Sequence, residues 1–116
     1  MQSDDSSCPL ARGKCVPCRG GVEPLTLEEI EPLKSQLHAD WRVIDGHHLE
    51  RAFRFKNFAS ALEFTNNVGA IAEEQQHHPD IQLGWGKVVV TLYTHKIGGL
   101  HENDFILAAK IDEIVQ

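Results

Sequence analysis

The residues of this chain whose types could do chemistry gather between Glu73 and Asp104. This stretch holds the adjacent His77 and His78, a third histidine at His95, and an acid at each end. Imidazole is the side chain whose unperturbed pKa lies near neutral pH, so a histidine cluster can donate and accept protons or bind a metal. The stretch therefore indicates either proton transfer or metal binding.

Glu73 and His77 are separated by three residues, a spacing that places two side chains on one face of a helix. A carboxylate at that distance can orient an imidazole and stabilise its protonated form. His78 must project in another direction, and His95 lies close to a pair of glycines where a side chain can face a cleft. We therefore expect Glu73 to support His77.

A metal site built from His77, His78, His95 and a carboxylate is the alternative interpretation of this cluster. Against it, adjacent histidines diverge, and no His-x-His or His-x3-His pair supplies two ligands from one element. A third interpretation treats these histidines as capping and surface residues. The residues alone leave the three interpretations open.

The elements that must position these residues follow from the hydrophobic periodicity. Thr26 and Glu29 have the spacing of a capping box, which predicts a helix after Thr26. Pro32 falls inside that helix and predicts either a kink or a later start. Two strands follow, and His47 and His48 in the turn between them are expected to be solvated. These two strands and the later periodic segments (a long amphipathic helix, two strands and a final helix) span residues 41–45, 49–55, 57–76, 81–85, 88–95 and 105–115.

The predicted order of elements is α-β-β-α-β-β-α. Closely spaced strand pairs favour antiparallel pairing, so we predict an α+β domain over residues 25–116. Its four-stranded antiparallel sheet is expected to carry the helices on one face.

Length and charge limit the classes of function. A chain of 116 residues forms one small domain. Its net charge of −6 argues against a nucleic-acid partner, because phosphate binding relies on clustered Lys and Arg. No apolar run approaches the ~20 residues that span a bilayer, and the polar, acidic start is unlike a secretory signal. We expect a cytoplasmic protein with no membrane partner.

Residues 1–24 are rich in Ser, Asp, Gly and Pro and show no period, so they are predicted to form a flexible arm. Cys8, Cys15 and Cys18 all lie there, and their odd number is unlike a disulfide scaffold. Cys15 and Cys18 form a CxxC pair that could bind zinc or take part in redox chemistry. A structural zinc site needs four ligands, so we favour a flexible or loosely docked arm.

The whole pattern resembles the motif of the pterin-4a-carbinolamine dehydratases, with the spacing Glu73-x3-His77-His78-Pro79-x5-Trp85-x9-His95-x8-Asp104. The resemblance runs from about Leu25 to Ile114. It implies dehydration of a tetrahydropterin that carries a hydroxyl at carbon 4a, with neither cofactor nor metal. The product would be the quinonoid dihydropterin, which a reductase returns to the tetrahydro form in tetrahydrobiopterin recycling.

The resemblance also implies roles for residues. His77 and His95 would be the acid/base pair, His78 would position the pterin, and Glu73 would support His77. Asp104 matches the acid of the motif, although a first-turn helix acid is the interpretation we favour for it. The residues expected to bind the pterin are Gln76, His77, His78, Pro79, Trp85, Tyr93, Thr94, His95 and Lys96.

Two of these expectations carry a structural alternative. Trp85 could stack on the flat pterin or close a small core. Members of the family usually carry Thr where this chain has His101, at the expected cap of the last helix. Loss of such a cap should cost on the order of 1 kcal/mol of stability.

The resemblance implies partners as well as chemistry. We expect a homodimer or homotetramer, because the apolar face from Phe58 to Ile71 exceeds what a small sheet can cover. An aromatic amino acid hydroxylase system is the expected source of the substrate. The alternative function is a non-catalytic binding module that acts as a dimerisation or assembly cofactor of a protein partner.

Overall fold

The computed structural model describes residues 9–16 and 21–115. Its elements in chain order are η1 (Pro9–Arg12), α1 (Leu27–Lys34), β1 (Arg42–Ile44), β2 (His48–Arg54), α2 (Phe58–Gln75), β3 (Asp80–Leu83), β4 (Lys87–Leu92), η2 (His95–Ile97) and α3 (Glu102–Ile114). The four strands form one antiparallel sheet in the order β1-β2-β4-β3. The predicted α+β class and four-stranded antiparallel sheet are confirmed.

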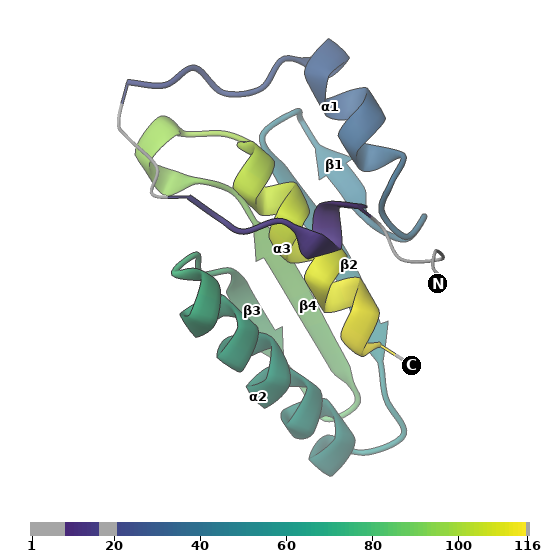
Figure 1. Ribbon diagram of the computed structural model, residues 1–116. Coiled ribbons are helices and arrows are strands. Elements are labelled where there is room, and N and C mark those ends of the chain that lie inside the picture. The colour runs from purple at the N-terminus through teal and green to yellow at the C-terminus, as the bar shows by residue number, and fades with distance from the viewer. Residues whose placement is uncertain (1–8, 17–20, 116) are drawn as a thin grey trace, which may run out of the picture.

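Helices α2 and α3 lie on the same face of the sheet, and the core fills the space between them (Figure 1). Period-two alternation explains why the strands face this way. In β2, Leu49, Arg51 and Phe53 are buried, whereas the residues between them point outward. In β4, Val88 and Val90 are fully buried under the helices. No helix in residues 9–16 and 21–115 is long and apolar enough to cross a membrane.

The helix starts follow their caps. Thr26 accepts a hydrogen bond from Glu29 N, and Glu29 returns one to the Thr26 backbone, so α1 begins at Leu27. The later start that Pro32 suggested is therefore wrong, because the capping box already satisfies the first turn. Asn57 caps α2 by accepting from Ser60 N.

The Asp112 carboxylate on α3 ties that helix to two other parts of the fold. Its oxygens accept from Trp41 Nε1 at 2.7 Å, Arg51 Nη1 at 2.7 Å and His38 N at 3.0 Å. Arg51 is buried and lies over the Phe53 ring, with 4.4 Å between its Cζ and the ring centroid. Asp112 therefore satisfies a buried cation that the packing of β2 places in the core.

Residues 9–16, which we call the N-terminal strap, lie along α3 (Figure 1). They belong to the segment predicted as a flexible arm, and the structure gives them specific contacts. Leu10 and Ala11 are buried, and Ala11 O accepts from Lys110 Nζ at 2.8 Å. Val16 exchanges two hydrogen bonds with the Asn103 side chain, at 2.9 and 2.7 Å. Two buried apolar residues are too few to give a hydrophobic pattern, so hydrophobic periodicity did not predict that the strap docks.

Cys15 in the strap donates its backbone N–H to Gln75 Oε1 at 2.8 Å, and its Sγ lies 3.5 Å from Asn103 O. Burial raises the pKa of the Cys15 thiol to about 11, with a further rise from Asp104 and an opposing effect of Lys110. A thiol with this pKa is protonated at neutral pH. Cys8 and Cys18 lie outside the described residues, so the zinc and redox interpretations of the CxxC pair stay predictions.

Asp112→Ala is expected to lower the free energy of unfolding by about 3–5 kcal/mol, because it leaves the buried Arg51 guanidinium without its counter-charge. Urea denaturation measures the change. Glu63→Ala removes an exposed carboxylate on α2 and should stay within about 0.5 kcal/mol. Equal losses for the two variants would show that Asp112 does not hold α3 to the sheet.

Docking of the strap should protect Cys15 from alkylation. At pH 9 a thiol with the ordinary pKa of 9.0 is half ionised, whereas one with a pKa of about 11 is roughly 1% thiolate, so alkylation should be roughly 50-fold slower. The measurement uses a Cys8→Ser, Cys18→Ser variant with iodoacetamide, folded and in urea. Asn103→Ala, which removes both bonds to Val16, should speed the reaction of the folded protein. Equal rates in the folded and denatured protein would contradict the docking.

Candidate active site

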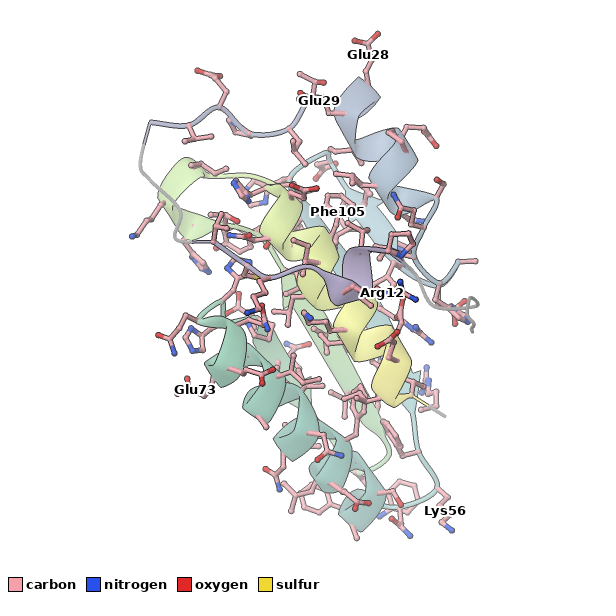
Figure 2. All side chains as sticks on the ribbon, in the orientation of Figure 1. Arg12, Glu28, Glu29, Lys56, Glu73 and Phe105 are labelled. Carbon is pink, nitrogen blue, oxygen red and sulfur yellow. The ribbon has the colours of Figure 1, made fainter. Side chains whose placement is uncertain are left out.

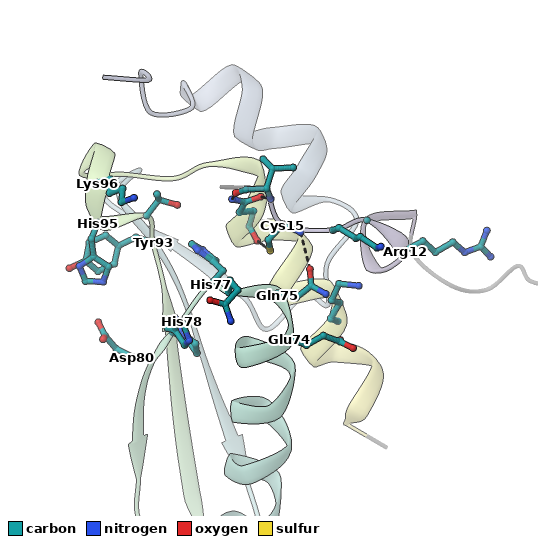
Figure 3. Close-up of a pocket in the computed structure, with 18 residues that line it drawn as sticks. Arg12, Cys15, Glu74, Gln75, His77, His78, Asp80, Tyr93, His95 and Lys96 are labelled. Carbon is teal, nitrogen blue, oxygen red and sulfur yellow. Dashed lines mark hydrogen bonds between the residues drawn. The ribbon is translucent and has the colours of Figure 1, made fainter. Parts of the chain in front are cut away.

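A cavity of ≈ 1020 Å³ lies at the end of the sheet where α2 ends and α3 begins. Figure 3 shows the histidines on one side of it and the N-terminal strap on the other. Eight of the residues predicted to bind the pterin line this cavity: Gln76, His77, His78, Pro79, Tyr93, Thr94, His95 and Lys96. The structure thus brings together residues from the end of α2, the start of β3 and the segment after β4.

His77 is held by a fully buried carboxylate. Its Nε2 lies 2.6 Å from Asp104 Oδ1, and Asp104 is 0% exposed. The second oxygen, Oδ2, accepts from Thr94 Oγ1 at 2.9 Å and from His101 N at 3.0 Å. A carboxylate that accepts at both oxygens favours the His77 tautomer with its proton on Nε2. Nδ1 of His77 then remains to exchange a proton with a bound molecule.

The backbone at Gln76 explains why His77 reaches α3. Gln76 caps α2 in the left-handed region, with φ 54° and ψ 38°. The chain therefore leaves the helix before His77, and Pro79 prevents the helix from continuing. The i, i+4 relation between Glu73 and His77 does not survive this turn.

Glu73 instead contacts His78, with 2.6 Å between Glu73 Oε2 and His78 Nε2. The prediction that Glu73 supports His77 is therefore wrong, because the left-handed cap rotates His77 away from the helix face. Both partners of the Glu73–His78 pair are exposed, at 74% and 56% of their side chains. An exposed pair of this kind contributes little to stability, since water screens it.

His95 rests on an aromatic stack. Its ring centroid lies 4.1 Å from that of Tyr93, and Tyr93 in turn lies 4.7 Å from His47. His47 Nδ1 is 3.1 Å from His48 Nδ1. The prediction that His47 and His48 are merely solvated is wrong, because both are half-buried in this stack. His47, in the turn between β1 and β2, thus packs on the Tyr93 ring that contacts His95.

Asp104 is a first-turn acid of α3, as predicted, and it also holds His77. As the third residue of α3 it accepts from His101 N, which completes a capping box. His101 does not lose the cap, because its Nδ1 accepts from Asn103 N at 3.0 Å. The expected cost of replacing Thr by His at this position is therefore wrong.

Trp85 does not belong to the cavity or to the core. It is 70% exposed in the turn between β3 and β4, after β3 has ended at Leu83. The start of β3 is at the cavity, so the other end of the strand carries Trp85 away from it. The interpretation of Trp85 as a core residue is therefore wrong, and its role as a pterin platform stays a prediction that this cavity does not support.

The cavity wall made by the strap and α3 has no local signature in the sequence. Lys14, Cys15 and Val16 from the strap and Asn103 and Lys110 from α3 all line the cavity. The dashed line in Figure 3 marks the bond from Cys15 N to Gln75, which brings the strap close to the end of α2. These contacts join residues 60 or more positions apart, so no local pattern reveals them. Among the described residues, no group of three or more His, Cys, Asp or Glu side chains could hold a metal ion.

Comparison with known sequences identifies the family of the chain. The family model of the pterin 4 alpha carbinolamine dehydratases matches residues 23–114. Two bacterial relatives carry the name "Putative pterin-4-alpha-carbinolamine dehydratase". The protein of Alkaliphilus metalliredigens is 57% identical over 104 residues, which are 90% of this chain and 94% of the relative. That of Rubrobacter xylanophilus is 58% identical over 105 residues, covering 90% and 97%.

Solved structures give the same result. The crystal structure of a transcriptional coactivator/pterin dehydratase from Brucella melitensis superposes with a TM-score of 0.75 at 33% identity, over 81% of this chain and all of that one. A pterin dehydratase-like protein identified as a RuBisCO assembly factor in the alpha-carboxysome has a TM-score of 0.56 at 28% identity, over 66% and 89%. The chain belongs to the pterin-4a-carbinolamine dehydratase family.

Proposed function

We propose that this protein dehydrates a 4a-hydroxytetrahydropterin to the quinonoid dihydropterin, with His77 and His95 as its acid/base pair. The observation that carries the proposal is the 2.6 Å contact between His77 Nε2 and the buried Asp104, in the wall of a cavity that His95 also lines. Family membership supplies the class of substrate.

The reaction needs two proton transfers and no redox partner. The bond between C4a and the hydroxyl oxygen breaks, and the hydroxyl leaves as water after it receives a proton. N5 loses its proton, and its electron pair forms the double bond to C4a. Each positioned acid or base contributes about 10²–10⁴ in rate, which suits two histidines.

The environments of the two histidines suggest a division of roles. Asp104 stabilises the imidazolium that forms when His77 accepts a proton, so His77 Nδ1 is the better candidate for the base at N5. His95 is exposed and stacked on Tyr93, where it can deliver a proton to the departing hydroxyl. His78, restrained by Glu73 at the cavity, would position the pterin.

The product suggests where the reaction belongs. The quinonoid dihydropterin is two electrons short of the tetrahydropterin, so a reductase can restore the tetrahydro form. A hydroxylase that uses a tetrahydropterin would supply the 4a-hydroxylated substrate. We therefore place the protein in tetrahydrobiopterin recycling beside an aromatic amino acid hydroxylase system.

A second candidate function is that of a protein-binding cofactor. Two solved relatives are described as a transcriptional coactivator/pterin dehydratase and as a RuBisCO assembly factor. In this chain Phe58 and Leu62 are exposed apolar residues on the same side of α2. We propose that a second copy of the chain binds this surface, because it belongs to the apolar face of α2 from which we predicted a homo-oligomer.

His77→Ala and His95→Ala are each expected to lower kcat by about 10²-fold or more, and the double variant by much less than the product, because residues that act as a unit are non-additive. Turnover of synthetic 4a-hydroxytetrahydropterin measures both. His78→Ala should mainly raise KM. The matched control is His38→Ala, an exposed histidine that does not line the cavity.

His78→Ala and His95→Ala should lower Tm by no more than a few degrees, because both side chains are exposed at the cavity. His77→Ala should lower it further, because it removes a hydrogen-bond donor from the buried Asp104 carboxylate. If activity instead followed the folded fraction, the histidines would be structural. A folded His95→Ala variant with full turnover would exclude the acid/base pair.

The native protein is expected to be a dimer or tetramer by light scattering at micromolar concentration. Phe58→Glu with Leu62→Glu should reduce the assembly, because charges then replace the exposed apolar side chains of α2. Asn67→Glu adds a charge to another exposed side of the same helix and should leave the mass unchanged. A monomeric native protein, or one whose mass ignores the double change, would contradict assembly through α2.

A further inference from the structure

The N-terminal strap adds a wall to the cavity that the family domain does not supply. The family model begins at residue 23, whereas the strap spans residues 9–16. Yet Lys14, Cys15 and Val16 line the same cavity as His77. The strap is fixed there by Asn103 and Gln75, so its side chains are part of the site.

The cavity is larger than the reacting ring requires. Pockets for drug-sized ligands have volumes of about 300–1,000 Å³. At ≈ 1020 Å³ this cavity slightly exceeds that range, although the pterin nucleus is only a small two-ring system. A substrate held by His77 and His95 at C4a and N5 therefore leaves room beside it.

The substituent of the pterin is the group that can fill this room. C6 is bonded to N5, so a chain on C6 starts one bond from a reacting atom. The strap is close to His77, because Cys15 N donates a hydrogen bond to the side chain of Gln75, two residues before His77. A chain that leaves C6 can therefore extend along the strap.

The strap side of the cavity is basic in an acidic protein. Lys14 and Lys110 line it, against a net charge of −6 for the whole chain. Lys110 is held beside the strap by its bond to Ala11 O, and its charge acts on the cavity wall at Cys15. Glu74 is the acid on this side, and Figure 3 shows Arg12 extending away from the histidines. Two lysines thus line the room beside the ring.

We propose that the strap side of the cavity binds a phosphate carried on the C6 substituent of the pterin, with Lys14 and Lys110 as its contacts. This proposal rests on the proposed function, since it takes the pterin ring to lie at His77 and His95. It makes the strap the element that selects among pterins. The ammonium group of Lys is a common partner of phosphate as a point charge.

Isothermal titration of two stable 7,8-dihydropterins tests this proposal without any turnover. The two probes share one C6 hydroxyalkyl chain, which in one of them ends in a phosphate monoester. The native protein should bind the phosphorylated probe about tenfold or more tightly than the other, as expected for charge-assisted hydrogen bonds. In about 1 M salt the preference should shrink, because the Debye length falls to about 3 Å.

The ratio measured is the dissociation constant of the unphosphorylated probe divided by that of the phosphorylated one. It should fall in Lys14→Ala, and in Lys14→Glu the unphosphorylated probe should bind more tightly. Lys56→Ala removes the same charge at the far end of the molecule (Figure 2) and should leave the ratio unchanged. Equal binding of the two probes by native protein, or an unchanged ratio in Lys14→Glu, would overturn the proposal.

The two proposals fail in different ways. If the protein prefers the phosphorylated probe but does not turn over 4a-hydroxytetrahydropterin, the dehydratase proposal is wrong and the phosphate site stands. If turnover occurs but the preference is absent, the dehydratase proposal stands and the phosphate site is wrong.

Discussion

The buried carboxylate of Asp104 joins three parts of the fold at one point. Its oxygens accept hydrogen bonds from Thr94 Oγ1 in the segment after β4, from His101 N at the start of α3, and from His77 Nε2 in the turn after α2. An ionised carboxylate is costly to bury without such donors. The buried carboxylate therefore needs all three donors, and it holds the sheet, both helices and His77 in one arrangement. The group that caps α3 is the same group that orients the candidate base.

The three histidines at the cavity differ in how tightly they are held. His77 has a 12% exposed side chain and a fixed partner, whereas His78 is 56% exposed and paired only with an exposed glutamate. His95 has a ring beneath it instead of an acid. One restrained imidazole and two freer ones suit a site where one proton acceptor must be placed accurately and the others can adjust to the ligand.

Periodicity and spacing predicted the sheet, the order of elements and the histidine cluster, because all three depend on local sequence. They did not predict the partner of His77, since that depends on the left-handed backbone of a single residue, Gln76. They also missed the strap, whose contacts with Asn103 span 87 positions. Trp85 was misplaced because β3 is only four residues long, which leaves the tryptophan in the following turn.

The Asn103 amide imitates a backbone peptide: Oδ1 accepts from Val16 N, and Nδ2 donates to Val16 O. The strap is thus fastened at one end by a single rung of a ladder and at the other by the apolar Leu10. The number of residues between these two points sets which side chain lines the cavity. Insertion or deletion of one residue there would exchange Lys14 for a neighbour, so strap length is a means by which related chains could change ligands without altering the domain.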